Sequence, residues 1–441
     1  SLKFNAIRNY GNMTSYSFIH AADLHLDSPF KGLKQVSPLI AEELRKSTFE
    51  AFNAVLDLCV TEQVDALLIA GDIFDSADQS LQAQLTFVDG LKRLESEGIR
   101  CFVCHGNHDP LDAWRSEIPF PQNTVRFGEN VTSSELRPGD PESPLVYGFS
   151  YPTREVHENI VPEFRKAFQS GPVSIGLLHA NVGANTGHES YAPCNLEDLS
   201  GVGINYWALG HVHTRQEYNF DNGVAVYPGN IQGRHINERG PRGVYMVTIT
   251  EDGSIEHSFR PVDLIRWDEV HVDITDLDDD PSTETLENAI EEKIETALVG
   301  AEGRHLVYRL SLTGRGSLHA VINESEYNDA LIGRLNDQYM CRKPFAYCDR
   351  ITSATRREIN RDDYSGRDDF YGDLLQFFDK AKNGDEIISD LQADLRRFYG
   401  HTRLRRHLLD SMPENDALAS LLDEAESLCL DLLISEDEDE N

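Results

Sequence analysis

The sequence predicts an α/β fold over residues 13–262, because short apolar runs alternate there with stretches of helical periodicity. Each apolar run has the length of a buried strand and ends at a polar cluster. These runs are Ser17–Ile19, Ala66–Ile69, Cys101–Val103, Val173–Leu178 and Tyr206–Leu209. The repeated order of strand, polar loop and helix indicates sheets that are covered by helices.

Helices are predicted in the two gaps between the first three strands. The apolar positions are Phe49, Phe52, Leu56 and Cys59 in the first gap, and Leu81, Leu85, Val88 and Leu91 in the second. Residues three or four apart share one face of a helix, so each set forms an apolar stripe that can pack on a sheet.

Beyond residue 262 the pattern changes to a small α+β domain, predicted over residues 263–350. Its expected elements are strands at 270–274 and 305–310 and a helix at 285–298. Residues 351–434 show only helical periodicity, and amphipathic helices of this kind dock either on their own protein or on a partner. The acidic residues 435–441 are expected to form a disordered tail.

The charge of the chain is strongly acidic, with 75 acidic and 40 basic residues and a formal net charge of −35. A protein that handles DNA usually presents a basic surface to the phosphates, so this charge needs an explanation. One hypothesis is a host with a salty cytoplasm, where an acidic surface keeps proteins dispersed. The alternative is an ordinary acidic protein whose local arginines meet phosphate.

Cysteine usage and hydropathy indicate the compartment. Seven cysteines, an odd number scattered along the chain, do not resemble a disulfide framework and favour a reducing cytoplasm. Cys101 and Cys104 form a CxxC pair, but strand alternation would send their thiols to opposite faces. No apolar run approaches the roughly 20 residues that span a bilayer, so no membrane association is expected.

The polar clusters at the strand ends are rich in Asp, Asn and His. They contain Asp23 and His25, Asp72, Asn107 with His108 and Asp109, His179, and His211 with His213. Ligands of α/β sheets gather beyond the carboxyl ends of the strands, so we expect these side chains to converge. Each cluster alone is weak evidence for a functional site, whereas the whole set is strong evidence.

These residue types suit a pair of divalent cations. Two cations about 3.5–4 Å apart need a shared anionic oxygen to offset their repulsion, and Asp72 is placed to bridge them. Imidazoles mixed with carboxylates favour a transition metal, so manganese is the first expectation, with iron or zinc as alternatives. His211 and His213 alternate along an extended segment, so both rings can face the pair. His108 is not needed as a ligand and can donate to an anionic transition state.

The same motifs carry a family resemblance. Asp23-x-His25, Gly71-Asp72, Gly106-Asn107-His108-Asp109, the His179 segment and Gly210-His211-x-His213 resemble the motifs of calcineurin-like metallophosphoesterases. Their order and spacing, with the downstream domain, are similar to those of SbcD-type DNA repair exonucleases, and residues 20–30 and 227–235 look most like the YhaO branch. The resemblance is strong over residues 16–260. It implies a four-layer sandwich, in which helices flank two mixed sheets, followed by an α+β cap domain and C-terminal helices.

The resemblance also implies roles for the residues. One metal would take Asp23, His25, Asp72 and His213, and the other would take Asp72, Asn107, His179 and His211. His108 would act on the phosphate. The family implies manganese-dependent exo- and endonuclease activity on DNA, a cap that shapes DNA access, a dimer, and an SbcC-like coiled-coil ATPase docked on the C-terminal helices.

Asp75 departs from the family pattern, since well-studied relatives often carry a second catalytic His three residues after the bridging Asp. An ionised carboxylate cannot donate a proton and would repel a nearby phosphate, which puts the rate and the exonuclease mode in doubt. Asp27 and Asp109 follow ligands and are expected to orient them. Arg234 is expected either to contact phosphate or to form a surface salt bridge.

Three functions remain open at this point. The first is a DNA nuclease that works with an ATPase partner. The second is a phosphodiesterase or phosphatase for small nucleotides, which the acidic charge favours. The third is a binding subunit whose site has decayed, which is disfavoured because no ligand of the pattern is missing.

Overall fold

The structure is a computed structural model that describes residues 15–28, 38–75, 80–113, 118–171, 173–183, 191–277, 281–383, 393, 395, 397 and 415–439. The first two residues of the predicted first domain and most of 384–414 lie outside this set. The chain divides into two compact units, which are residues 1–270, 292–310 and 332–350, and residues 271–291, 311–331 and 351–441. The division runs through the predicted small domain, so the boundaries at 262 and 350 stay predictions.

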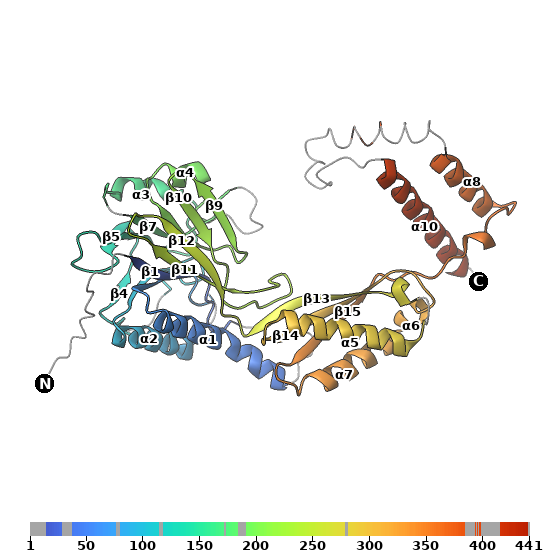
Figure 1. Cartoon of the computed structure of the whole chain (residues 1–441), viewed down its shortest axis with the longest axis horizontal. Coiled ribbons are helices and arrows are strands. Elements are labelled where there is room, and N and C mark those ends of the chain that lie inside the picture. Colours follow the sequence, from blue (N-terminus) through green and yellow to red (C-terminus); the bar gives the residue numbers. More distant parts are fainter. Residues whose placement is uncertain are drawn as a thin grey trace. The chain divides into compact units, whose positions relative to one another are not determined.

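The first unit contains two six-stranded mixed sheets (Figure 1). The first sheet has the order β12 (Ile255–Pro261), β11 (Gly243–Ile249), β1 (Tyr16–Ala21), β2 (Ala66–Ala70), β3 (Arg100–Cys104) and β4 (Thr124–Arg126). The second has the order β5 (Thr132–Glu135), β6 (Leu145–Gly148), β7 (Ser174–His179), β8 (Tyr206–Gly210), β10 (Gly223–Tyr227) and β9 (Gln216–Phe220). The neighbours β1, β2 and β3 run parallel, as do β7 and β8, so their carboxyl ends share an edge in each sheet.

Three apolar cores hold these layers together. The core between the sheets contains Phe18, Leu68 and Phe102 from the first sheet and Ile175, Leu177 and Tyr206 from the second. The outer face of the first sheet packs on α1 (Pro38–Thr61) and α2 (Leu81–Ser96), and that of the second on α3 (Val161–Ala167) and α4 (Leu196–Ser200). The order of helix, sheet, sheet and helix confirms the predicted four-layer α/β sandwich.

Two details of the predicted packing are tested by these cores. Cys101 packs on the helices and Cys104 lies between the sheets, so the thiols do point to opposite faces of β3. The stripe predicted for α2 is wrong at its start, because Leu81 and Leu85 are 65% and 43% exposed. The buried face of α2 instead centres on Phe87, a larger side chain whose burial removes more apolar surface from water.

Downstream of the sandwich lies a three-stranded sheet with the order β13 (Ile265–Asp273), β14 (His305–Thr313) and β15 (Ala346–Ser353). The helices of this part are α5 (Thr283–Gly300), α6 (His319–Ile322) and α7 (Ser325–Tyr339). Strands β13 and β14 and helix α5 confirm the elements predicted near 270, 305 and 285. The described helices lack any apolar stretch of membrane-spanning length.

Two further helices belong to the second unit, α8 (Phe370–Asn383) and α10 (Asn415–Asp439). Buried Glu426 on α10 accepts hydrogen bonds from Arg361, at 2.7 Å, and from Lys382 on α8, at 2.8 Å. Helix α10 extends into residues 435–441, and the disordered tail expected there stays a prediction.

Candidate metal centre

The candidate site lies beyond the carboxyl ends of strands from both sheets. Asp23 and His25 follow β1, Asp72 follows β2, Asn107 and His108 follow β3, His179 ends β7, and His211 and His213 follow β8. Parallel strands present these loops at the same edge, which is why residues far apart in the chain meet.

The backbone is left-handed at four of the seven predicted ligands. The φ angles are +51° at Asp23, +42° at His25, +50° at Asp72 and +101° at His211. Such conformations cost on the order of 1–3 kcal/mol each and persist where surrounding contacts hold them. Here the backbone N–H of Asp23 donates to Gly71 O at 3.1 Å, that of His25 donates to Asp72 O at 3.1 Å, and that of His211 donates to the Asp23 carboxylate at 3.1 Å.

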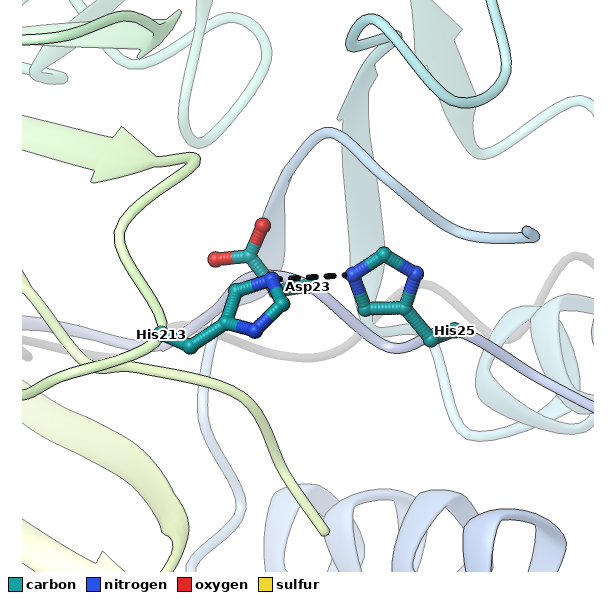
Figure 2. Close-up of side chains that lie close together, drawn as sticks. All are labelled: Asp23, His25 and His213. Atoms are coloured by element: carbon teal, nitrogen blue, oxygen red, sulfur yellow. Dashed lines mark hydrogen bonds between the residues drawn. The ribbon is translucent and has the colours of Figure 1, made fainter. Parts of the chain in front are cut away.

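The first group of ligand atoms comes from Asp23, His25 and His213, which lie within 4.8 Å of one another (Figure 2). The Nε2 atoms of His25 and His213 face each other at 3.1 Å, and His25 Nε2 lies 3.9 Å from Asp72 Oδ2. Either a shared proton or a shared cation can satisfy two facing imidazole nitrogens. The carboxylates beside them complete a nitrogen and oxygen donor set that fits a transition-metal cation.

The second group comes from Asp23, Asp72 and His179, again within 4.8 Å. His179 Nε2 lies 3.4 Å from Asp72 Oδ2 and 3.0 Å from Asn107 Oδ1, and Asn107 Oδ1 lies 3.3 Å from His211 Nδ1. The Asp72 carboxylate therefore lies between the two groups, as a bridging ligand must. All seven residues that the sequence predicts as ligands are brought together.

The far nitrogens of two ligand imidazoles are fixed by the protein. His179 Nδ1 is 2.9 Å from Ala70 O, and His213 Nδ1 is 2.7 Å from Glu238 Oε1, so each ring turns Nε2 toward the cluster. Glu238 is buried, and the sequence analysis missed it. It follows no predicted strand and lies 25 residues from its histidine, so neither strand-end position nor local spacing could reveal it.

The predicted orienting carboxylates behave differently from each other. Asp109 accepts hydrogen bonds from the backbone N–H groups of Asp72, Ile73 and Gly106, at 3.2, 3.1 and 2.9 Å. It therefore aligns the loops after β2 and β3. Asp27 donates its backbone N–H to Thr48 Oγ1 at 3.2 Å, and among the described contacts its carboxylate does not reach the cluster.

Asp75 is paired with the residue predicted to act on phosphate. His108 Nδ1 lies 2.7 Å from Asp75 Oδ1, and Asp75 Oδ2 accepts a hydrogen bond from Ser28 Oγ at 2.8 Å. Arg234 donates to Ser28 Oγ at 2.7 Å and lies 3.5 Å from Asp75 Oδ2. The guanidinium is buried, so the expected surface salt bridge of Arg234 is wrong: its ion-pair partners line the site.

The ionisation of the predicted ligands is mixed: Asp72 and His25 are in the form that a cation needs, whereas burial raises the pKa of Asp23. Burial opposes the charge of Asp72, but the His179 and His108 imidazoles outweigh it and hold the pKa of Asp72 well below its usual range. Burial lowers the pKa of His25 well below its ordinary value, and Arg234 adds to this effect, so His25 is neutral. Burial also opposes the charge of His179, yet Asp72 raises the pKa of His179 to about 9. Because a ligand imidazole must be neutral, a cation here displaces a proton from His179.

Comparison with known proteins identifies the family. A family model described as Calcineurin-like phosphoesterase matches residues 16–215, and one described as Metallophosphoesterase YhaO, middle domain, matches residues 267–356. The chain is 33% identical over 397 residues to a Bacillus subtilis (strain 168) protein described as Uncharacterized metallophosphoesterase YhaO, across 90% of this chain and 93% of that protein. The chain belongs to the calcineurin-like metallophosphoesterases.

More distant similarities of this metallophosphoesterase are partial. It is 25% identical over 252 residues to the DNA double-strand break repair protein Mre11 of Sulfurisphaera tokodaii, across 54% of this chain and 61% of that protein. A solved structure of a dimetal phosphatase from Danio rerio is similar with a TM-score of 0.37 and 11% identity, across 56% of this chain and 96% of that chain. The family fixes the reaction class as phosphoester hydrolysis and leaves the substrate open.

Substitution of Gly106 tests the metal site without removing a ligand. A Cβ atom at Gly106 would lie 2.3 Å from Asp72 Oδ1 and 2.7 Å from His179 Nε2, so Gly106→Ala must displace both ligands. We expect its affinity for Mn²⁺ to fall ~10–100-fold, as for lost ligand-orienting contacts. Isothermal titration calorimetry measures this.

The matched control is Gly128→Ala, because a Cβ at Gly128 meets no heavy atom within 4 Å. It should bind Mn²⁺ as the wild type does. Equal Mn²⁺ affinities of the wild type and Gly106→Ala would contradict the assignment of Asp72 and His179 to the metal site.

Proposed function

We propose that this metallophosphoesterase hydrolyses the phosphodiester bonds of DNA with two divalent cations, manganese being preferred. The observation that carries the proposal is the position of the Asp72 carboxylate between two groups of imidazole and oxygen donors. Two cations need such a shared anion to lie close together. The partial similarity to Mre11 supports DNA as the substrate.

The family resemblance implies two ligand sets, and the two groups of donors support them, with Asp23 belonging to both groups. Asp23, His25, Asp72 and His213 would hold one cation, and Asp72, Asn107, His179 and His211 would hold the other. When bound, the cations supply Lewis-acid stabilisation of the charge that develops on the phosphate.

His108 would act on the phosphate directly. Its Nδ1 is engaged by Asp75, which leaves Nε2 as the nitrogen available to a substrate oxygen. Burial opposes the cationic form of this ring, but the charges of Asp75 and Asp72 outweigh it and raise the pKa of His108 above its ordinary value. The protonated ring can donate to a leaving oxygen.

The pairing of Asp75 answers the doubt about its charge. The imidazole of His108 and the guanidinium of Arg234 both lie against this carboxylate, at 2.7 and 3.5 Å. These partners offset its negative charge, so the repulsion of phosphate that an isolated carboxylate would exert is reduced.

Cleavage of linear duplex DNA tests the proposed substrate. We expect Mn²⁺-dependent release of nucleotides by the wild type, and a loss of at least ~100-fold in His108→Ala with Mn²⁺ binding retained, as for removal of a general acid. His271→Ala is the control, because His271 is exposed on β13, a strand that contributes no residue to the candidate site.

Two other outcomes would favour the alternatives. Turnover of small nucleotides or a chromogenic diester, without DNA cleavage, would favour a nucleotide phosphodiesterase, which the net charge of −35 supports. A wild-type protein that binds no metal would favour a decayed binding subunit.

The pH dependence tests the pairing of His108 with Asp75. Because Asp75 raises the pKa of His108, it extends the protonated form of the ring to higher pH. In Asp75→Asn the pKa falls, so the alkaline limb of the pH–rate profile should move to lower pH. If the alkaline limb of the kcat profile lies at the same pH in the wild type and in Asp75→Asn, the proposed effect of Asp75 on His108 is contradicted.

By family analogy, we further propose that this protein is cytoplasmic and forms a dimer. We also propose that it acts with an SbcC-like coiled-coil ATPase. Large apolar side chains exposed on α8 and α10 support a docking role for these helices. They are Phe370, Phe377, Leu421, Leu428 and Leu432. The described cysteines, which are all free, agree with a reducing compartment.

Substitution on α10 tests the partner. Charge placed on an apolar docking face is costly, so the double variant Leu428→Glu, Leu432→Glu should lose stable complex formation with a purified SbcC-like ATPase. Analytical size exclusion with light scattering detects the complex and the dimer. Val299→Glu is the control, since Val299 is 80% exposed on α5. If the double variant still forms the complex, this face of α10 is not the docking site of the ATPase.

A further inference from the structure

Arg234 lies in the segment between β10 and β11 and reaches two other parts of the site. Its Nη1 donates to Ser28 Oγ at 2.7 Å and lies 3.5 Å from Asp75 Oδ2. Its backbone N–H donates to Glu238 Oε2 at 2.7 Å, and its Nη2 lies 3.9 Å from Glu238 Oε1. The residue is only 9% exposed, so these groups are its main surroundings.

The two carboxylates beside Arg234 each engage a different imidazole of the site. Glu238 Oε1 lies 2.7 Å from Nδ1 of the ligand His213, and it also lies 3.3 Å from His235 Nε2. Asp75 Oδ1 lies 2.7 Å from Nδ1 of His108. One carboxylate therefore orients a metal ligand, and the other orients the ring that acts on phosphate.

Both carboxylates need a positively charged side chain nearby because they are withdrawn from water. Glu238 is 3% exposed, and the Asp75 side chain is 22% exposed. Carboxylates in such surroundings are costly unless charge and hydrogen bonds compensate them. A guanidinium can serve two acceptors at once because its donors spread over a rigid planar fork.

We infer that Arg234 is a positioning residue that joins the carboxylate behind His213 to the carboxylate behind His108, through Ser28 on the Asp75 side. The inference rests on the proposed function, since it assigns Arg234 to the same phosphodiesterase site. It replaces the phosphate contact expected from the sequence. The buried guanidinium of Arg234 thereby holds the orientation of both the metal ligand His213 and the phosphate-acting ring of His108.

The Nε atom of Arg234 is buried without a hydrogen-bond partner among the described residues. A contact from Nε to a substrate phosphate would act on binding of the substrate, whereas positioning acts on the chemical step. The two roles therefore differ in which kinetic constant changes.

The experiment compares full-length wild type, Arg234→Gln and Arg239→Gln. Arg239 is the matched control, because it lies in the same segment and pairs with Glu269 at 2.6 Å with half of its side chain exposed. Steady-state hydrolysis of a chromogenic phosphodiester gives kcat and KM, and the electron paramagnetic resonance signal of free Mn²⁺ gives metal affinity without turnover.

For Arg234→Gln we expect kcat to fall ~10–100-fold and Mn²⁺ affinity to fall ~10-fold or more, with KM little changed, as for the loss of a residue that orients ligands. Arg239→Gln should match the wild type in kcat, KM and Mn²⁺ affinity. A raised KM with unchanged kcat would assign Arg234 to phosphate binding and overturn the inference, as would unchanged kcat and Mn²⁺ affinity.

Ser28→Ala keeps the inference falsifiable if Arg234→Gln does not fold. It deletes only the oxygen that accepts from Arg234 and donates to Asp75, at 2.7 and 2.8 Å. A lower kcat with normal KM supports the connection, and unchanged kcat overturns it. A wild type that binds Mn²⁺ but hydrolyses no diester, or that binds no Mn²⁺, refutes the proposed function instead.

Discussion

The metal centre depends on one buried carboxylate that is not a ligand. Asp109 accepts hydrogen bonds from three backbone N–H groups, two in the loop after β2 and one in the loop after β3. A buried N–H group that loses its partner costs about 1–3 kcal/mol, so the Asp109 carboxylate holds these two loops firmly together. Asp72 is fixed at its backbone in this way, and its own carboxylate then accepts the backbone N–H of His108 at 3.0 Å. Asp72 and His108 are thus placed by a single chain of contacts.

The sequence predicted the part of the site that strand ends impose. Buried parallel strands read as apolar runs, and a polar residue directly after such a run lies at the edge of the sheet, so the convergence of the seven predicted ligands could be expected from their positions. Glu238, Ser28 and the contacts of Arg234 could not be found in this way. Their contacts join loops that follow different strands, and neither periodicity nor spacing reports such pairings.

The error in the fold has a similar cause. Leu81 and Leu85 share helical spacing with Val88 and Leu91, but the sheet receives the face that carries Phe87. Periodicity gives the existence of a helix, while the rotation of the helix depends on the side chains that the sheet can accept.

The position of Asp75 illustrates how an acidic group can take part in this chemistry. The Asp75 carboxylate lies 2.7 Å from His108 Nδ1, where it can hold the imidazole in one orientation. The cost of an additional negative charge beside a phosphate site is offset by Arg234. Local pairing at the site is therefore a better guide to phosphate chemistry than the net charge of the chain.

The ligands come from both sheets, with β1, β2 and β3 in one and β7 and β8 in the other. Cations held between them would fasten the two halves of the sandwich to each other across their common apolar core. By mass action, an ion present at ~1,000 times its dissociation constant stabilises the native state by about 4 kcal/mol. The supply of metal in the cell would thus set the resistance of the sandwich to unfolding and proteolysis, independently of any turnover.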